Sequence, residues 1–464
     1  MGPAALSVFD DVLDRARRWV GDWLAGLGER PVGVPLAPAA MRARLDGELP
    51  EEGEPASQVL EDLAAAVEPG LVASAGPRYF GFVTGGALPA ALGADWMVTA
   101  ADQNAAVYAM SPAAAVVEET AGRWVLDLLG LPGDATVGFG TGAQMANVSC
   151  LAAARRALLL TRGWDVESDG LADAPVPTVV IGEQAHATLL QALRLLGLGS
   201  GRAVRVPVDD QGRMRADALR ARLDGVTGPV LVCAQAGNVD TGASDPFAAI
   251  ADALAARGGE AWLHVDGAFG LWAAAAPGRR HLVAGVERAD SWAVDAHKWL
   301  NVPYDCGMAV VRDRAALAGA LTTSAAYIGF GELDPSSRVP ESSRRARATP
   351  VYAALRSLGR RGVADLVERC CTLARQAADE LGRHPEIEVL NAVELNQVLF
   401  RPRHGDAREL ADAVQRDGTC WIGTSVWDGR PALRLSVSNW STTPADVTRS
   451  TDRVLALVEA AGQR

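Results

Sequence analysis

The stretch Ser291-Trp-Ala-Val-Asp295-Ala-His297-Lys298-Trp299 reads as a short buried strand that ends close to a His-Lys pair. Lys298 is the only lysine among 44 basic residues, and all the others are arginine. Lysine can form an imine, whereas arginine cannot. A single surviving lysine can also be chance or a solvated loop residue, but Trp299 and Leu300 give it an apolar setting that favours the neutral amine. The stretch therefore predicts a reactive lysine beyond a strand end.

Strands and helices alternate around this stretch from about residue 76 to residue 325. β-branched runs predict strands at Thr178–Ile181, Ala203–Val208, Val230–Ala234, Trp262–Val265, Ser291–Val294 and Met308–Val311. Helical spacing predicts helices at Ala187–Leu196, Ala216–Leu223 and Phe247–Arg257. This alternation is typical of an α/β domain with a large mixed, mostly parallel sheet. Such sheets bind ligands beyond the carboxyl ends of their strands.

Three further segments flank the predicted 76–325 domain. Residues 1–75 predict helices within Val8–Trp23 and Val59–Val67, and we expect this segment to pack on a partner such as a second subunit. Residues 326–350 form a candidate active-site loop, and residues 351–464 predict a smaller C-terminal α+β domain. The elements expected in that domain are helices at Val351–Leu381, Ala407–Arg416 and Pro444–Ala460 and strands at Glu388–Leu390, Gln397–Arg401 and Leu433–Val437.

Composition excludes several classes of protein. The net charge of -12 argues against nucleic-acid binding, and no window of eighteen apolar residues predicts a membrane span. The N-terminus lacks the pattern of a secretory signal. The six cysteines form no CxxC pair and show no metal-like spacing with histidine, so we expect no metal. Scattered cysteines in a chain of this length predict reduced thiols and a cytoplasmic location.

A second strand, in Trp262-Leu-His-Val-Asp266-Gly-Ala268-Phe-Gly270, ends on an acid followed by small residues. Asp266 can cap the next helix, or it can lie at the ligand face of the sheet. Pyridoxal phosphate (PLP) needs a lysine for its Schiff base and an acid that keeps the pyridine nitrogen protonated. Asp266 and Lys298 at the ends of two strands can reach opposite parts of one such ring.

Two other motifs fit the same ligand. Val137-Gly-Phe-Gly-Thr141-Gly-Ala143-Gln144-Met-Ala-Asn147 places small residues at a helix start, where free N–H groups suit a phosphate, although a tight turn explains it equally. His186 follows the strand Thr178–Ile181 and can stack on a flat ring or serve as a capping or core histidine. Three of six histidines, His186, His264 and His297, lie at or beside these strand ends.

Together the motifs resemble the PLP-dependent group II amino-acid decarboxylases, the family of aromatic-amino-acid and glutamate decarboxylases, from about residue 60 to the C-terminus. His297-Lys298-Trp299 is the most specific match. The resemblance implies the aspartate aminotransferase-like fold, fold type I, and a homodimer with the active site between subunits. It implies catalytic roles for Lys298, His186, His297 and Asp266. The cofactor-binding residues that it implies are Thr141, Ala143, Gln144, His186, Asn238, Asp266, Ala268, His297 and Lys298.

The chain departs from the family pattern in two places. Gln235-Ala-Gly237-Asn238-Val239 stands where the family often has Thr-x-Gly-Thr-Thr. Asn238 is therefore the candidate replacement for a contact to the cofactor's phenolic oxygen or to the substrate carboxylate. Family decarboxylases reprotonate Cα with a tyrosine on a mobile loop, but this chain has no tyrosine between Tyr327 and Tyr352. Relatives that lack this tyrosine can divert the carbanion toward oxygen and release an aldehyde.

Three functions therefore follow from the sequence. The leading hypothesis is a PLP-dependent lyase that decarboxylates an L-amino acid. The second keeps the cofactor but couples decarboxylation to oxidative deamination, or performs an aminotransferase or aldolase reaction. The third is a binding protein without catalysis. The substrate stays open, because Tyr79–Val83 and Trp96–Tyr108 can line an aromatic pocket or pack in a core.

Overall fold

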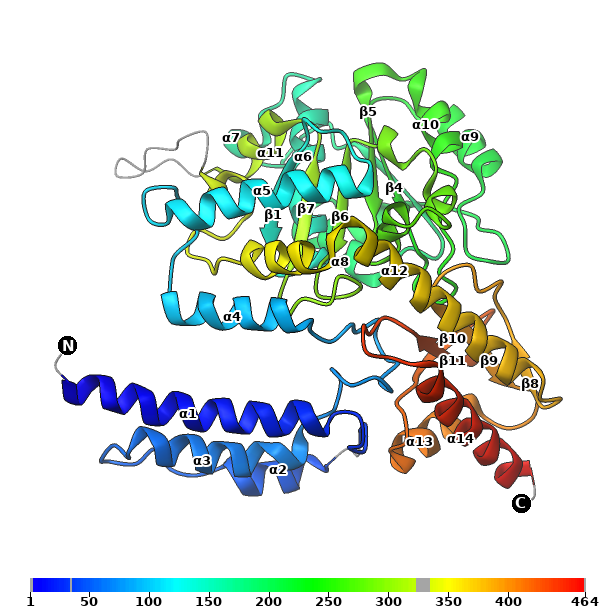
Figure 1. Ribbon diagram of the computed structural model, residues 1–464. Coiled ribbons are helices and arrows are strands. Elements are labelled where there is room, and N and C mark those ends of the chain that lie inside the picture. Colours follow the sequence, from blue (N-terminus) through cyan, green and yellow to red (C-terminus); the bar gives the residue numbers. More distant parts are fainter. Residues whose placement is uncertain (1–2, 34–35, 323–333, 463–464) are drawn as a thin grey trace.

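A seven-stranded sheet forms the centre of the computed structural model, which describes residues 3–33, 36–322 and 334–462 (Figure 1). The strand order is β1-β7-β6-β5-β4-β2-β3. Only β7 runs antiparallel to its neighbours, so the predicted mixed, mostly parallel sheet is confirmed. The strands are β1 Thr136–Gly140, β2 Thr178–Gly182, β3 Val204–Val206, β4 Val230–Gln235, β5 Ala261–Asp266, β6 Ser291–Asp295 and β7 Gly307–Val311. The sequence patterns had indicated all of these except β1.

Alternation along the strands gives the sheet two apolar faces. In β5, Leu263 and Val265 join the cluster on one face, whereas Trp262 joins the cluster on the other. Both faces need helical cover, because each buries large apolar side chains. One face carries α6 Ala143–Leu160, α8 Ala187–Leu195 and α11 Arg314–Leu321, and the other carries α5 Pro112–Leu129, α9 Ala216–Asp224 and α10 Phe247–Ala255. The short helix α7 spans Val166–Asp169.

A smaller antiparallel sheet of order β10-β11-β9-β8 follows in the C-terminal part. Its strands are β8 Ile387–Val389, β9 Gln397–Pro402, β10 Gly423–Trp427 and β11 Arg430–Ser436, and its helices are α13 Ala407–Asp417 and α14 Pro444–Gly462. The long helix α12 Ala348–Gly382 packs on α5 and also on α14, so it joins both units (Figure 1). A kink at Gly359, where φ is 61°, redirects this helix and favours glycine. The division of the chain into segments 1–75, 76–325, 326–350 and 351–464 stays a prediction.

The N-terminal helices lie apart from the central sheet and pack on one another (Figure 1). They are α1 Pro3–Gly26, α2 Pro38–Leu45 and α3 Ala56–Val67, and the chain then continues into α4 Pro89–Ala101. Phe9, Leu13 and Leu63 expose about half or more of their surface, at 54%, 60% and 49%. Across the three described ranges, no helix has the length and apolar character needed to cross a membrane.

Candidate active site

A cavity of about 600 Å³ lies beyond the carboxyl ends of β4, β5 and β6. Parallel neighbouring strands bring residues distant in sequence to this one edge, as expected for an α/β sheet. Eight of the nine predicted cofactor-binding residues line the cavity. These are Thr141, Ala143, Gln144, His186, Asp266, Ala268, His297 and Lys298.

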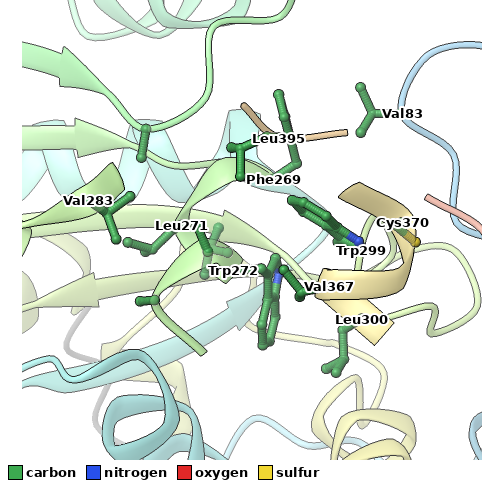
Figure 2. Packing of buried hydrophobic residues seen from close by; sticks show 14 of the residues in the cluster. Val83, Phe269, Leu271, Trp272, Val283, Trp299, Leu300, Val367, Cys370 and Leu395 are labelled. Carbon is green, nitrogen blue, oxygen red and sulfur yellow. The ribbon is translucent and has the colours of Figure 1, made fainter. Parts of the chain in front are cut away.

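Buried aromatic residues fix the segment that carries Lys298. Trp299 and Leu300 are 1% exposed, and the Trp299 ring lies 6.4 Å from that of Phe269, centroid to centroid (Figure 2). Trp272 Nε1 donates to the carbonyl oxygen of Asp295 at 2.9 Å. A Cβ atom at Gly85 would lie only 1.9 Å from the carbonyl oxygen of Lys298, so this close approach requires glycine. The lysine therefore projects from a rigid turn into the cavity.

Asp295 contacts both the lysine and the predicted phosphate loop. Its Oδ2 lies 2.9 Å from Lys298 Nζ, and its Oδ1 accepts the N–H of Ala143 at 2.6 Å. His297 Nε2 lies 3.5 Å from the same Oδ1. Asp295 is 2% exposed, and it is a site residue that the sequence reasoning missed, although it stands within the decisive stretch. The position of Asp295 at the end of a strand, on the α6 side of the sheet, is the signal that could have identified it as a site residue.

Asp266 ends β5 and faces the same cavity from the neighbouring strand. Its Oδ2 accepts from Asn147 Nδ2 at 3.2 Å, and its Oδ1 accepts from the N–H of Ala268 at 3.3 Å. The side chain is almost fully buried, yet it has no cationic partner among the salt bridges of residues 3–33, 36–322 and 334–462. The Asp266 carboxylate can therefore accept a hydrogen bond from a ligand that enters the cavity.

His186 combines the two roles that the sequence left open. It caps α8, because its Nδ1 accepts the N–H of Thr188 at 3.3 Å, and it also lines the cavity. Enclosure by the cavity walls lowers the pKa of His186 below its usual value, and the carboxylate of Asp266 opposes this shift. The ring is therefore neutral near pH 7, with its proton on Nε2 because Nδ1 accepts a hydrogen bond.

His297 is held from both sides. Its Nδ1 accepts the N–H of Cys306 at 3.1 Å, and the ring of Tyr304 lies 4.4 Å away, centroid to centroid. Burial lowers the pKa of His297, while Asp295 opposes the shift. Tyr304 was not predicted as a site residue, yet it lines the cavity, and its hydroxyl lies 3.4 Å from Thr84 Oγ1.

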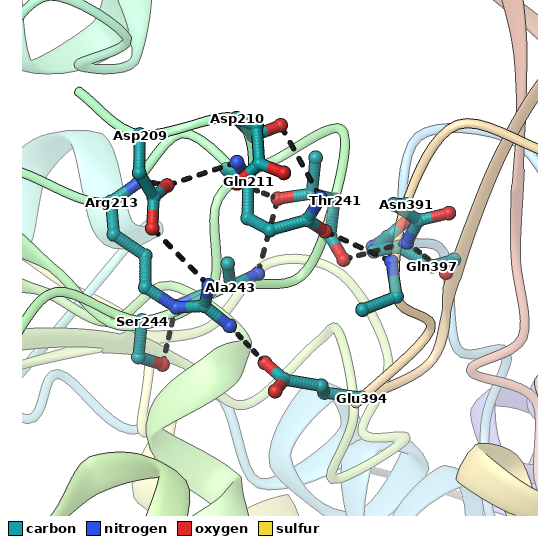
Figure 3. A network of polar contacts seen from close by, with 12 residues as sticks. Asp209, Asp210, Gln211, Arg213, Thr241, Ala243, Ser244, Asn391, Glu394 and Gln397 are labelled. Carbon is teal, nitrogen blue, oxygen red and sulfur yellow. Dashed lines mark hydrogen bonds and ion pairs between the residues drawn. The ribbon is translucent and has the colours of Figure 1, made fainter.

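The structure does not bring Asn238 into the cavity. Its Oδ1 accepts the N–H groups of Asp240 and Thr241 at 2.9 and 3.2 Å and thereby forms a turn. A polar network anchors this turn: Thr241 Oγ1 donates to the carbonyl of Gln211 at 2.6 Å, and Asn391 Nδ2 donates to that of Thr241 at 2.8 Å (Figure 3). The neighbours Gly237 and Val239 line the cavity instead.

Arg434 reaches the cavity from β11 of the smaller sheet. Its Nη1 donates to the carbonyl of Val239 at 3.1 Å and lies 3.6 Å from Asp240 Oδ1. The sequence predicts only that Arg434 lies in the strand Leu433–Val437, because no local signal shows that this strand meets the distant sheet. The guanidinium is the one cation besides Lys298 among the lining residues that the structure describes.

These groups fit pyridoxal phosphate by their own chemistry. The cavity offers an amine at Lys298, an acceptor at Asp266 for a protonated ring nitrogen, and a flat ring at His186. The first turn of the eighteen-residue helix α6 supplies N–H groups for a phosphate. In the part of the chain that the structure describes, no three His, Cys, Asp or Glu side chains are grouped to hold a metal ion.

Comparison with known proteins places this site in context. The model of the pyridoxal-dependent decarboxylase conserved domain matches residues 38–403. Tryptophan decarboxylase 1 of Oryza sativa subsp. japonica is 29% identical over 470 residues, which cover 93% of this chain and 90% of the relative. L-2,4-diaminobutyrate decarboxylase of Rhizobium meliloti is 31% identical over 382 residues, covering 78% and 74%. A crystal structure of Oryza sativa TDC with PLP and tryptamine superposes with a TM-score of 0.90 at 25% identity and covers 99% of both chains.

Proposed function

The chain belongs to the pyridoxal-dependent decarboxylase family, and from this premise we propose that it is a carboxy-lyase that removes CO₂ from Cα of an L-amino acid. The observation that carries the proposal is that Lys298 and Asp266 face one cavity from neighbouring parallel strands. Pyridoxal phosphate is the cofactor, and when bound it supplies an electron sink for the bond broken at Cα.

Each cavity residue then has a defined task. The amine of Lys298 attaches the cofactor and later carries a proton, and the carboxylate of Asp266 holds the proton on the ring nitrogen. Thr141, Ala143 and Gln144 bind the phosphate at the start of α6. The neutral ring of His186 covers one face of the cofactor, and the small side chain of Ala268 leaves space for it. His297 assists proton transfer beside the lysine.

Arg434 is the proposed partner of the substrate carboxylate. Its planar guanidinium can bind a carboxylate through two parallel hydrogen bonds. Phe82, Val83 and Tyr304 give the same cavity an apolar and partly aromatic wall. This wall, together with the similarity to a tryptophan decarboxylase, supports a substrate with an apolar or aromatic side chain.

Product analysis with a panel of L-amino acids tests the proposal. The purified protein with added PLP should release CO₂ and the matching amine in equal amounts, fastest from an apolar or aromatic amino acid. The absence of CO₂ with every amino acid would reject the carboxy-lyase and would favour an aminotransferase, an aldolase or a binding protein.

One observation favours a second candidate, an aldehyde-forming oxidative decarboxylase. Residues 328–351 contain no tyrosine, and Tyr304 is the one phenol that lines the cavity within the described ranges. Residues 328–333 lie outside the described residues. In this reaction O₂ is reduced to H₂O₂, and the amino acid together with one water molecule gives CO₂, ammonia and an aldehyde. Peroxide and aldehyde equal to CO₂ would support it, whereas amine without peroxide would reject it.

The homodimer and the cytoplasmic location belong to the same proposal. The exposed apolar residues Phe9, Leu13 and Leu63 of α1 and α3 support a second copy as the partner of the N-terminal segment. All six cysteines are unpaired and buried, which accords with reduced thiols in the cytoplasm. Sedimentation of the purified chain should show a dimer, and Leu13→Glu should weaken it. A monomeric wild-type protein would reject this assembly.

A further inference from the structure

A second polar group extends behind Asp266, away from the cavity. The period of two along β5 puts Trp262, His264 and Asp266 on the face that α6 covers. Ser291, the first residue of β6, pairs in register with His264. The helix α6 packs on both strands, and its Asn147 contacts His264 and Asp266 of β5. His264 therefore lies behind the cavity wall, although its strand-end position had pointed toward the site.

Four hydrogen bonds join these residues into one chain. Asn147 Nδ2 lies 3.2 Å from Asp266 Oδ2, and Asn147 Oδ1 lies 2.8 Å from His264 Nε2. His264 Nδ1 lies 2.9 Å from Ser291 Oγ. Trp262 Nε1, which can only donate, lies 2.9 Å from the same Ser291 Oγ. Each polar atom of the side chains of Asn147 and His264 is thus paired.

The proton positions along this chain follow from Asp266. An ionised carboxylate only accepts hydrogen bonds, so Asn147 must present its NH₂ group to Asp266 and its carbonyl oxygen to His264. His264 then carries its proton on Nε2, and its Nδ1 accepts the hydroxyl proton of Ser291. The four hydrogen bonds are therefore mutually consistent when Asp266 is the acceptor at the end of the chain.

Burial strengthens the preference for this arrangement of hydrogen bonds. Asn147, His264 and Ser291 have no exposed surface, and burial lowers the pKa of His264 to about 3, so the imidazole stays neutral. A buried donor or acceptor that loses its partner costs about 1–3 kcal/mol, and water cannot replace the partner here. Rearranging any member would leave such an unpaired atom, so the chain keeps the NH₂ group of Asn147 directed at Asp266.

We infer that Asn147, His264 and Ser291 are positioning residues that orient the Asp266 side chain as an acceptor for the pyridine nitrogen of the cofactor. This inference rests on the proposed function, because it requires the cofactor ring to face Asp266. The residues act through Asp266 and do not touch the cavity. A purely structural role would instead stabilise the packing of α6 on β5 without regard to what the cavity binds.

A cofactor analogue with C–H in place of the ring nitrogen separates these two roles. Equilibrium dialysis of the full-length, cofactor-free chain gives the Kd of PLP and of this analogue for each variant. Asn147→Ala should raise the Kd of PLP by roughly 10- to 100-fold, from the loss of a charge-assisted hydrogen bond. It should change the Kd of the analogue by less than about threefold, because the analogue has no nitrogen for Asp266 to hold.

Three further variants make the experiment decisive. His264→Phe keeps a ring of similar size but removes the donor to Asn147, so it should act in the same direction. His264→Gln keeps a side-chain NH₂ that can donate to Asn147 and should stay closer to wild type. Asn391→Ala is the matched control, since Asn391 is also buried and doubly bonded through Nδ2 but lies outside the cavity lining. It should leave the ratio of the two Kd values unchanged.

Two different failures can be told apart. If Asn147→Ala and His264→Phe weaken the binding of both ligands equally, this chain of hydrogen bonds only stabilises the packing of α6 on β5, and the inference is wrong. If the wild-type protein binds neither ligand, or binds both with the same Kd, then the proposed role of Asp266 itself fails. Measurement of the ratio within each variant cancels any general loss of stability.

Discussion

Lys298 Nζ lies 2.9 Å from Asp295 Oδ2, while Asp295 Oδ1 accepts the N–H of Ala143 at 2.6 Å. The buried carboxylate of Asp295 thus forms an ion pair with Lys298 and also accepts a hydrogen bond from a backbone N–H group at the start of α6. That N–H group belongs to the proposed phosphate site. A phosphate bound there would bring a second negative charge close to the Asp295 carboxylate, and like charges repel each other.

Asp295→Asn should therefore have two opposite effects. It should destabilise the cofactor-free protein by about 1–3 kcal/mol, because a charge-assisted hydrogen bond is lost and the lysine loses its counter-charge. It should strengthen the binding of inorganic phosphate, because a negative charge leaves the anion site. Denaturant unfolding and phosphate titration measure the two effects. Asp305→Asn is the control, since Asp305 pairs with Arg347 nearby. Weaker phosphate binding by Asp295→Asn would contradict this interpretation.

Replacing Arg434 should mainly affect the binding of the amino-acid substrate. Arg434→Met keeps the apolar length of the side chain but removes the guanidinium, and the KM should rise about tenfold or more, with a smaller change in kcat. Arg430→Met is the matched control, because Arg430 lies on the same strand but is exposed. Steady-state kinetics of CO₂ release give both constants. An unchanged KM would show that another group binds the carboxylate.

The buried His264 predicts a specific dependence of stability on pH. Burial lowers its pKa from 6.5 to about 3, so the unfolded chain binds a proton that the folded chain excludes. Stability from this residue is complete above its usual pKa and falls as the pH decreases toward about 3. At about pH 5 the loss should be roughly 2 kcal/mol relative to about pH 8. Unfolding of wild type and His264→Gln at both values measures it; equal pH dependence would refute the assignment.

The sequence predicted the sheet and most of the cavity because both depend on local patterns. Lys298 and Asp266 each follow an apolar strand, and parallel strands bring their carboxyl ends together. Ala143 and Gln144 were found through the small residues that open α6. Such signals need only a few neighbouring residues, and they identified eight lining residues of the cavity.

Residues that depend on distant contacts were missed or misplaced. Arg434 belongs to the smaller sheet, and no local pattern reveals that β11 reaches the cavity. Asn238 was expected at the cofactor, but an asparagine can also bond to N–H groups two and three residues ahead, and here that turn prevails. His264 was expected near the site, yet strand alternation directs it toward α6. β1 and β10 were missed as well.

Covalent labelling at Lys298 tests the central claim most directly. Borohydride converts a lysine–pyridoxal phosphate linkage into a stable secondary amine, and Lys298 is the only lysine in the chain. Mass spectrometry of the PLP-loaded, reduced protein should show one phosphopyridoxyl group, located on the peptide that contains Lys298, and Lys298→Ala should carry none. A chain without this mass, or with the label retained in Lys298→Ala, would contradict the account.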